Sequence, residues 1–363
     1  MIRETLAALA MGIVLTTAVS AQEKTVHVYN WSDYIDPKTL ESFTEETGIK
    51  VVYDTYDNNE IVETKLLAGK SGYDVIVPSG PFIQRLIPAN VLMKLDKSKL
   101  PNLKNMWPEI NERLTVYDPG NLYTVNFMWG TTGFAYNVDL VRQHLGDDAP
   151  IDSWDILMDP KYSDKLKDCG IYVLDSSEDM FPNLLNYVGV NPDSKNADDI
   201  RKAAEAFSKI RHNIRKFHSS EYIDMLANGS ICLAAGYSGD LIQAKNRAEE
   251  AKNGVNITYS IPKEGALIWF DNFVIPADAP HPDAAHAFID YMMRPEIAAA
   301  NANYVHYASG VLVARELVRE EIRNDPGVYP PDEIMKRLFV NTVYDSKTQR
   351  LVTRLWTQIK SGR

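Results

Sequence analysis

Hydrophobic runs and amphipathic segments alternate along the first part of the chain. Short apolar runs predict strands at Thr25–Tyr29, Ile49–Tyr53 and Tyr73–Val77. The segments between them, Pro37–Thr47 and Asn59–Ala68, have apolar residues at helical spacing and are each followed by glycine. An order of strand, helix, strand, helix, strand favours a parallel sheet with helices on both faces. We therefore expect an α/β fold.

Two polar turns follow the first and third predicted strands. The first, Tyr29–Tyr34, contains aromatic rings, a hydroxyl and a carboxylate, and the second contains Ser79. Ligands in open α/β sheets bind beyond the carboxyl ends of strands, so these turns are expected to meet at one sheet edge. Rings and an acid together favour a cationic ligand. The alternative is a helix cap at Asp36 and Pro37, and both interpretations can hold together.

The middle of the chain predicts a second lobe. The strand pattern Phe127–Tyr136 is interrupted by two glycines, and we interpret it as a crossing between lobes; an edge strand with bulges is the alternative. A length of 363 residues also favours two domains. The predicted division is a signal peptide at 1–21, a first lobe at 22–131 plus 259–305, and a second lobe at 132–258 plus 306–363. In the second lobe we expect the strands Gly170–Leu174 and Ser230–Ala235, the helices Ala197–Arg211, Ser220–Ala227 and Gly239–Ala251, and the strand Asn256–Ile261, which would return to the first lobe.

The N-terminus has the pattern of a cleaved secretory signal. Leu6–Val19 is largely apolar, and Val19-Ser20-Ala21 is a small-residue cleavage site, so the mature chain is expected to begin at Gln22. The residue directly after this site is Gln22 and not cysteine, which argues against a lipid anchor there. No later stretch reaches 18 apolar residues, so we expect no transmembrane helix. The protein is predicted to be exported.

Charge and cysteine content further limit the classes of partner and the cysteine chemistry that we expect for this protein. A net charge of -11 makes nucleic acid and anionic membranes poor partners. The only two cysteines, Cys169 and Cys232, favour one disulfide in an exported protein, with two buried free thiols as the alternative. Such a bridge would contribute about 3–4 kcal/mol by closing a loop of about 60 residues.

Four further segments repeat the combination of a ring or hydroxyl with an acid or a second ring after an apolar run. Each has a structural explanation as a helix cap or a core residue, but their recurrence in both predicted lobes is the stronger observation. They are Asp175–Asp179, Tyr237–Asp240, Trp269–Asp271 and Tyr304–Tyr307.

Signatures of catalysis are mostly absent. The sequence contains no G-x-S-x-G, H-E-x-x-H or G-x-x-x-x-G-K-S/T motif. His281 and His286 flank Pro282 at a spacing poorly suited to a metal, and we expect both on the surface. We expect no cofactor and no metal site. Paired carboxylates can run glycoside hydrolysis, so a secreted carbohydrate-active enzyme using paired aspartates remains the alternative from another class.

The ordered set of these motifs resembles the bacterial periplasmic polyamine-binding proteins of ABC importers, and among them the putrescine-binding receptors most. The resemblance covers nearly the whole mature chain. It implies a periplasmic binding protein of type II, with two α/β lobes around a ligand cleft and crossover hinge strands. It also implies that Cys169 and Cys232 form the disulfide of the family.

The resemblance assigns a ligand site residue by residue. Ring walls, carboxylates and hydroxyls would surround a polyamine, with either Asp179 or its neighbour Glu178 as one acid. Tyr237 stands where the family has tryptophan, and Trp269 where it has phenylalanine, so the preferred ligand length is left open. The implied site comprises Trp31, Ser32, Asp33, Tyr34, Ser79, Asp179, Tyr237, Asp240, Trp269, Asp271 and Tyr307.

The leading hypothesis is a monomeric periplasmic receptor, without enzymatic activity, that delivers putrescine to an ABC permease. A receptor of the same fold for spermidine or another cationic solute is the first alternative, and a polyamine sensor that docks on a membrane signalling protein is another. A diamine carries two ammonium groups, and burying either one unpaired would be unfavourable by several kcal/mol. Carboxylates at both ends would pair with the ammonium groups, and aromatic walls would contact the methylene chain.

Overall fold

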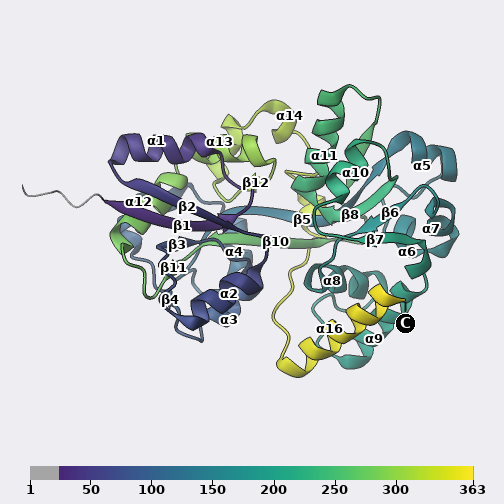
Figure 1. Ribbon diagram of the computed structural model, residues 1–363, viewed down its shortest axis with the longest axis horizontal. Helices are drawn as coiled ribbons and strands as arrows, with labels where there is room; N and C mark the ends of the chain where they lie inside the picture. Colours follow the sequence, from purple (N-terminus) through teal and green to yellow (C-terminus); the bar gives the residue numbers. More distant parts are fainter. Residues whose placement is uncertain (1–23, 363) are drawn as a thin grey trace, which may run out of the picture.

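The computed structural model describes residues 24–362, so the predicted signal peptide lies outside the described residues. The chain forms two lobes that lie side by side and are joined by long strands (Figure 1). A three-stranded sheet, in the order β2-β1-β3, lies in the first lobe. A seven-stranded sheet, with the path β10-β5-β8-β6-β7 and with β9 and β12 also paired to β5, extends through both lobes. The prediction of an α/β architecture with crossing strands is confirmed.

The first lobe begins with the predicted alternation of strands and helices. Strands β1 (Thr25–Trp31) and β2 (Lys50–Tyr56) pair in parallel, and β3 (Val75–Ile76) pairs in parallel with β1 on its other edge. Helices α1 (Pro37–Thr47) and α2 (Asn59–Ala68) have the predicted bounds. The Asp36 side chain accepts a hydrogen bond from the backbone N–H of Lys38, which confirms the predicted cap of α1.

A helix also begins where only a turn was predicted. Helix α3 (Gly80–Leu86) starts directly after Ser79, with Pro81 in its first turn. The helix buries the side chains of Phe82, Ile83 and Leu86. This apolar face holds the helix in place despite its short length. Its start places Ser79 at the helix N-cap position.

The remaining elements of the first lobe follow in two blocks of sequence. The described structure has them as α3, β4 (Leu92–Met93), η1 (Lys97–Lys99), η2 (Pro101–Asn105), α4 (Pro108–Leu114), β10 (Leu267–Phe273), β11 (Ile275–Pro276), α12 (Pro282–Met292), α13 (Pro295–Val305), β12 (Ala308–Ser309), η4 (Leu312–Leu317), α14 (Glu320–Arg323) and α15 (Asp332–Met335).

The second lobe surrounds β6, β7 and β8. Its described elements are α5 (Val138–Leu145), α6 (Asp155–Met158), α7 (Pro160–Leu166), β6 (Ile171–Val173), α8 (Ser177–Tyr187), α9 (Ala197–Ser208), η3 (Arg211–Asn213), β7 (Ile214–Phe217), α10 (Tyr222–Ala227), β8 (Leu233–Tyr237), α11 (Ser238–Ala251), β9 (Ile257–Ser260) and α16 (Ser346–Ser361).

Strand β5 (Val125–Asn137) crosses between the lobes and is buried along its whole length. Its first half pairs with β10 and its second half with β8 and β9, so it contributes side chains to the hydrophobic cores of both lobes. At Gly130 an added Cβ would lie 2.5 Å from the Trp269 ring, so the glycine permits close packing in this strand. The strand predicted at Asn256–Ile261 is present as β9 (Ile257–Ser260), but it pairs with the second-lobe half of β5, and the strand that returns the chain to the first lobe is β10.

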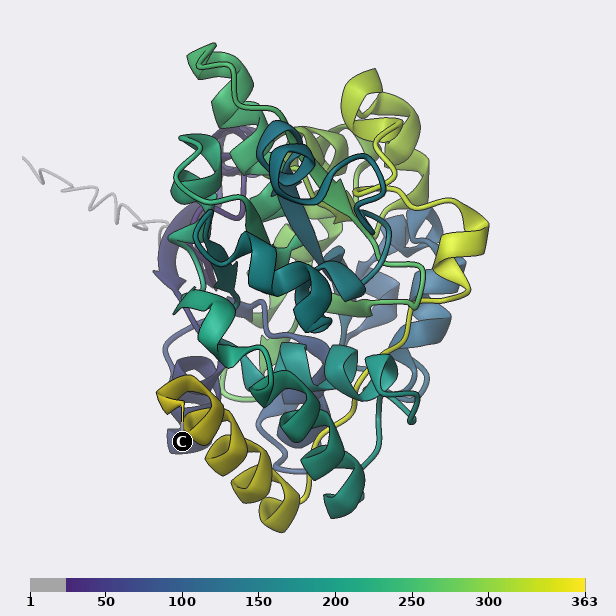
Figure 2. The same cartoon turned by 90° about the vertical axis from the view of Figure 1, so that its right-hand side faces the viewer.

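The C-terminal part of the chain divides between the lobes. Side chains from Val311 to Leu338 belong to the hydrophobic core of the first lobe, together with β1 and α12. Helix α16 packs on α8 and α9 of the second lobe, at the lower left of Figure 2. The predicted lobe boundaries stay a prediction, but this packing favours moving residues 311–338 from the second lobe to the first.

One histidine lies elsewhere than predicted. His286 is only 3% exposed: its Nε2 accepts a hydrogen bond from the backbone N–H of Asp96, and its Nδ1 lies 2.7 Å from the backbone oxygen of Pro282. The expectation of a surface position was wrong for this residue, because it stands on the buried face of α12. His281 is partly exposed and pairs with Asp74.

Cys169 and Cys232 form a disulfide whose Cα atoms are 5.6 Å apart. The bridge joins the segment before β6 to the segment before β8, neighbouring strands of the second lobe. It closes a loop of 63 residues, which includes α8, α9 and α10. Closing a loop of this length restricts the unfolded chain, and so stabilises the lobe.

We expect the double variant Cys169→Ala/Cys232→Ala to lose about 3–4 kcal/mol of unfolding free energy, chiefly because its unfolded chain gains freedom. Urea unfolding followed by circular dichroism measures this loss. Reduced wild-type protein provides the matched control and should unfold near the variant's midpoint. A variant as stable as the oxidised wild type would contradict a stabilising role for the bridge.

Candidate ligand-binding site

Three carboxylates form the centre of the candidate site, and each accepts hydrogen bonds from two hydroxyl groups. Asp271 accepts from Ser79 Oγ at 2.6 Å and Tyr34 OH at 2.9 Å. The other two accept in the same way: Asp179 from Ser176 Oγ and from Tyr237 OH at 2.8 Å, and Asp240 from Tyr222 OH at 2.8 Å and Tyr307 OH at 2.9 Å.

Local secondary structure positions the three acids. Asp179 is the third residue of α8, and Ser176 caps that helix by accepting from the Asp179 backbone N–H. Asp240 is the third residue of α11, so both acids lie in first helical turns, where the helix dipole favours negative charge. Asp271 lies in β10, and its backbone forms a bridge with Ser79, which stands before α3. The first two acids therefore come from the second lobe, and the third from a crossing strand.

Aromatic rings form a continuous wall beside these acids. Tyr307 contacts both Tyr34 and Trp269 edge-on, with ring centroids 5.5 and 5.2 Å apart, and Tyr237 contacts Trp269 in the same manner at 5.7 Å. The backbone of α11 approaches this wall closely: an added Cβ at Gly239 would lie 2.4 Å from the Tyr307 ring. A larger residue at this position would force the ring and α11 apart.

Burial governs the charge state of the acids. It raises the pKa of Asp179, Asp240 and Asp271, the last to about 7, while the hydroxyl donors partly oppose the shift. No ion pair formed by residues 24–362 includes any of the three. Clustered carboxylates that form no ion pair with a described residue suit a ligand with more than one positive charge, and aromatic walls suit its hydrocarbon part.

The structure brings most of the predicted site residues together. The hydrogen bonds and ring contacts connect Tyr34, Ser79, Asp179, Tyr237, Asp240, Trp269, Asp271 and Tyr307. Trp31 lies next to them: its Nε1 donates to the backbone oxygen of Val77, and its ring contacts Tyr56.

Two predicted residues lie apart from this network. Ser32 is exposed and donates to Asp57. Asp33 is also exposed and has a φ of 54°, in the left-handed region, whereas the next residue, Tyr34, is buried in the network. Of the two candidate acids on α8, Asp179 belongs to the network. Burial raises the pKa of the Glu178 carboxyl to about 7; Arg85 of the first lobe lowers it, and Asp179, Glu60 and Glu63 raise it further.

Sequence reasoning missed three polar residues that support the site. Ser176 and Tyr222 supply the second hydroxyl to Asp179 and Asp240, and Asn59 exchanges two hydrogen bonds of 3.0 Å with Ser79. The helix-cap pattern of Ser176 followed three residues later by an acid was a usable signal. Tyr222 precedes Asp240 by 18 residues and had no such local signal.

Comparison with known proteins places the chain in a family. Residues 38–330 match the family described as "Bacterial extracellular solute-binding protein". The chain is 53% identical to the putrescine-binding periplasmic protein SpuD of Pseudomonas aeruginosa, and 49% identical to the putrescine-binding periplasmic protein PotF of Escherichia coli. Each alignment covers 99% of this chain and 98% of the relative.

Solved structures agree with these relatives. The spermidine/putrescine ABC transporter substrate-binding protein PotD of Streptococcus pneumoniae superposes with a TM-score of 0.80 at 34% identity, covering 93% of this chain and 99% of the other. The predicted type II periplasmic binding protein fold is thereby confirmed, and a solute-binding role replaces the enzyme alternative. The chain belongs to the bacterial extracellular solute-binding protein family.

Proposed function

We propose that this protein is a periplasmic receptor that binds a polyamine, with putrescine as the first candidate, between its two lobes. The observation that carries the proposal is the set of Asp179, Asp240 and Asp271, each hydrogen-bonded by hydroxyls and none paired with a cation of the described chain. Two relatives with alignments covering 99% of this chain are named as putrescine-binding proteins, which supports this choice of ligand.

The arrangement suits a diamine on physical grounds. Each ammonium group would receive carboxylates, and the methylene chain would lie against the rings of Trp269, Tyr237 and Tyr307. Cation–π contacts with such rings contribute about 0.5–2 kcal/mol each. Because the acids come from both the second lobe and a crossing strand, a bound dication would neutralise groups that otherwise repel. Closure is then favoured by ligand through its higher affinity for the closed arrangement.

The same proposal extends to location and partner. Cleavage after Ala21 would release the mature chain into the periplasm, where a membrane ABC permease would receive the ligand from the monomeric receptor. Among residues 24–362, no helix is long and apolar enough to cross a membrane. Fractionation of cells expressing the full chain, with mass determination of the N-terminus, tests this part; a cytoplasmic, uncleaved chain would contradict it.

The ligand prediction is tested by calorimetric titration of the mature chain with putrescine, cadaverine, agmatine, spermidine and spermine. We expect putrescine to bind most tightly, with heat release and an increased unfolding temperature. The longer amines should bind more weakly if the wall of Trp269 and Tyr237 limits the length of the site. The absence of both heat and thermal shift with every amine would refute the proposal.

Asp240→Asn is expected to weaken putrescine binding by about 1–3 kcal/mol, or roughly 5- to 150-fold, because one ammonium group would lose a charged acceptor. Titration calorimetry on folded variant protein measures the change. Asp148→Asn removes the same charge from an exposed position and serves as the matched control, with unchanged affinity expected. Equal affinities of wild type and Asp240→Asn would remove Asp240 from the site.

Binding should strengthen as pH rises toward the pKa of Asp271, about 7. Below that pH the ligand must displace the proton, which weakens affinity about tenfold per pH unit for each proton displaced. The same shift lowers the stability of the unliganded protein as pH rises from about 4 to about 7, since the folded state holds the proton longer than the unfolded state.

Titrations at pH 5, 6, 7 and 8 with wild type and Asp271→Asn measure this dependence. The wild type should lose at least about tenfold more affinity between pH 8 and pH 5 than the variant does. Parallel pH profiles would show that Asp271 takes no part in proton displacement.

A further inference from the structure

A third connection between the lobes runs near the C-terminus, through residues 339–345, here named the C-terminal crossing segment. It begins in the first lobe, where Phe339 accepts a hydrogen bond from the backbone N–H of Ile268 and donates to Ala266. It ends at Asp345, whose side chain caps α16 on the second lobe. Between these ends, its residues contact the two lobes alternately.

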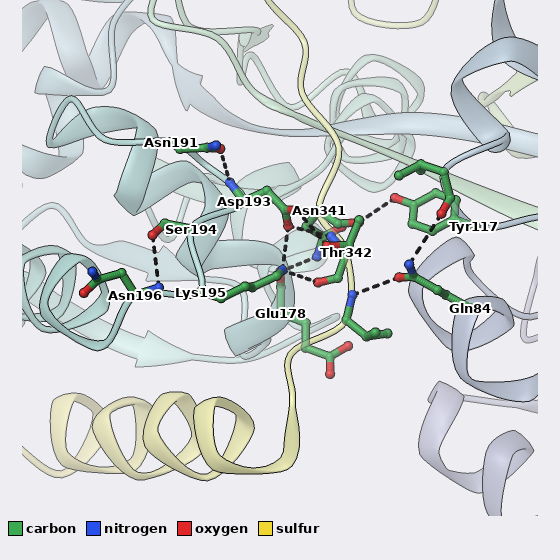
Figure 3. Close-up of polar contacts among 12 residues, drawn as sticks. Gln84, Tyr117, Glu178, Asn191, Asp193, Ser194, Lys195, Asn196, Asn341 and Thr342 are labelled. Atoms are coloured by element: carbon green, nitrogen blue, oxygen red, sulfur yellow. Dashed lines mark hydrogen bonds and ion pairs between the residues drawn. The ribbon is translucent and has the colours of Figure 1, made fainter. Parts of the chain in front are cut away.

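The second lobe holds the segment firmly at Thr342. Asp193 accepts from both the backbone N–H and the hydroxyl of Thr342, at 2.6 and 2.7 Å. Lys195 donates to the backbone oxygen of Thr342 at 2.6 Å and to Asp193 at 2.6 Å, and its ammonium also lies 4.4 Å from the centroid of the Tyr344 ring. Figure 3 shows Asp193 and Lys195 converging on this residue. Charged groups make this attachment strong.

Beyond Phe339, the first lobe holds the same segment by two neutral hydrogen bonds from side chains. Gln84 Oε1 accepts from the backbone N–H of Val343 at 3.1 Å, and Tyr117 OH donates to the backbone oxygen of Asn341 at 2.8 Å. In Figure 3 both side chains approach the segment from the side opposite Asp193. Neutral bonds are weaker than charge-assisted ones, so separation of the lobes would break these two contacts before the attachment at Thr342.

The contacts of the segment also lead to the candidate site. Asn341 Nδ2 donates to the backbone oxygen of Glu178, the residue before Asp179. The Tyr117 ring lies against Gly80, where an added Cβ would be 2.4 Å away, and Gly80 follows Ser79. Helix α3 begins after Ser79 and carries Gln84. The segment therefore contacts the neighbour of Asp179 in the second lobe. Through Tyr117 and Gln84 it also contacts the start of α3, next to Ser79, in the first lobe.

We propose that Gln84 and Tyr117 are positioning residues that fasten the C-terminal crossing segment to the first lobe, stabilise the closed arrangement and slow the release of bound ligand. The release part rests on the proposed function. Ligand contacts close the lobes at the site residues themselves, and these two bonds hold the lobes at positions next to the site. Their removal leaves the site residues unchanged, but makes opening easier.

The test compares the double variant Gln84→Ala/Tyr117→Phe with the matched double variant Gln358→Ala/Tyr304→Phe, which changes the same residue types at exposed positions. Stopped-flow tryptophan fluorescence measures putrescine association and release. We expect the first variant to release putrescine about 5- to 50-fold faster, with association within about twofold of wild type. The control should keep both wild-type rates.

A second measurement needs no ligand. Small-angle X-ray scattering of the unliganded proteins should give a larger radius of gyration for Gln84→Ala/Tyr117→Phe than for wild type and control. If wild type binds putrescine and the variant releases it at the wild-type rate, the proposal is overturned. If wild type binds no amine, the proposed function fails, and an unchanged radius of gyration then overturns the positioning role separately. Gln84→Ala alone, at a partly exposed position, gives the same comparison if the double variant does not fold.

Discussion

The structure depends on keeping three carboxylates in a largely buried cluster without an ion pair to any cation of the described chain. Asp179, Asp240 and Asp271 are held by hydroxyls alone, and burial raises the pKa of each. Neutral donors orient the carboxylate oxygens but leave their charge uncompensated. The negative charge of these carboxylates can therefore be neutralised by a small dication that binds between them. A lysine or arginine side chain of the protein at this place would neutralise the carboxylates itself and so weaken the binding of a dication.

The two-lobed architecture determines which elements carry these acids. Two come from the first turns of α8 and α11 in the second lobe, and one from β10, which lies beside the long crossing strand β5. Tyr307, from the first-lobe core, donates to Asp240 on α11, so the site itself spans the lobes. Any change in the angle between lobes alters the spacing of the acids, which couples ligand charge to closure.

A second set of contacts, next to the site, is proposed to act on the same motion. The C-terminal crossing segment is attached to the second lobe through charged groups and to the first through Gln84 and Tyr117. Because the attachments differ in strength, the bonds to Gln84 and Tyr117 would break first when the lobes separate. Affinity in such a receptor depends on ligand contacts and also on bonds that the ligand never touches, because both sets contribute to the free energy of the closed arrangement.

Local pattern determined much of this protein. The alternation of apolar runs and helical spacing predicted β1, α1, β2 and α2, with the Asp36 cap of α1 and the glycine after each helix, because these depend on residues close in sequence. Acids and rings at strand ends carried the resemblance that assigned the site, and the structure connects eight of the residues so assigned. Ser32 and Asp33, which the resemblance also assigned to the site, are exposed and lie outside these contacts, so their part in ligand binding stays a prediction. Tyr222, Asn59 and the contacts of Gln84 and Tyr117 join residues from separate elements. Only the tertiary structure decided those pairings, since they arise from how the lobes pack and not from any local preference of the chain.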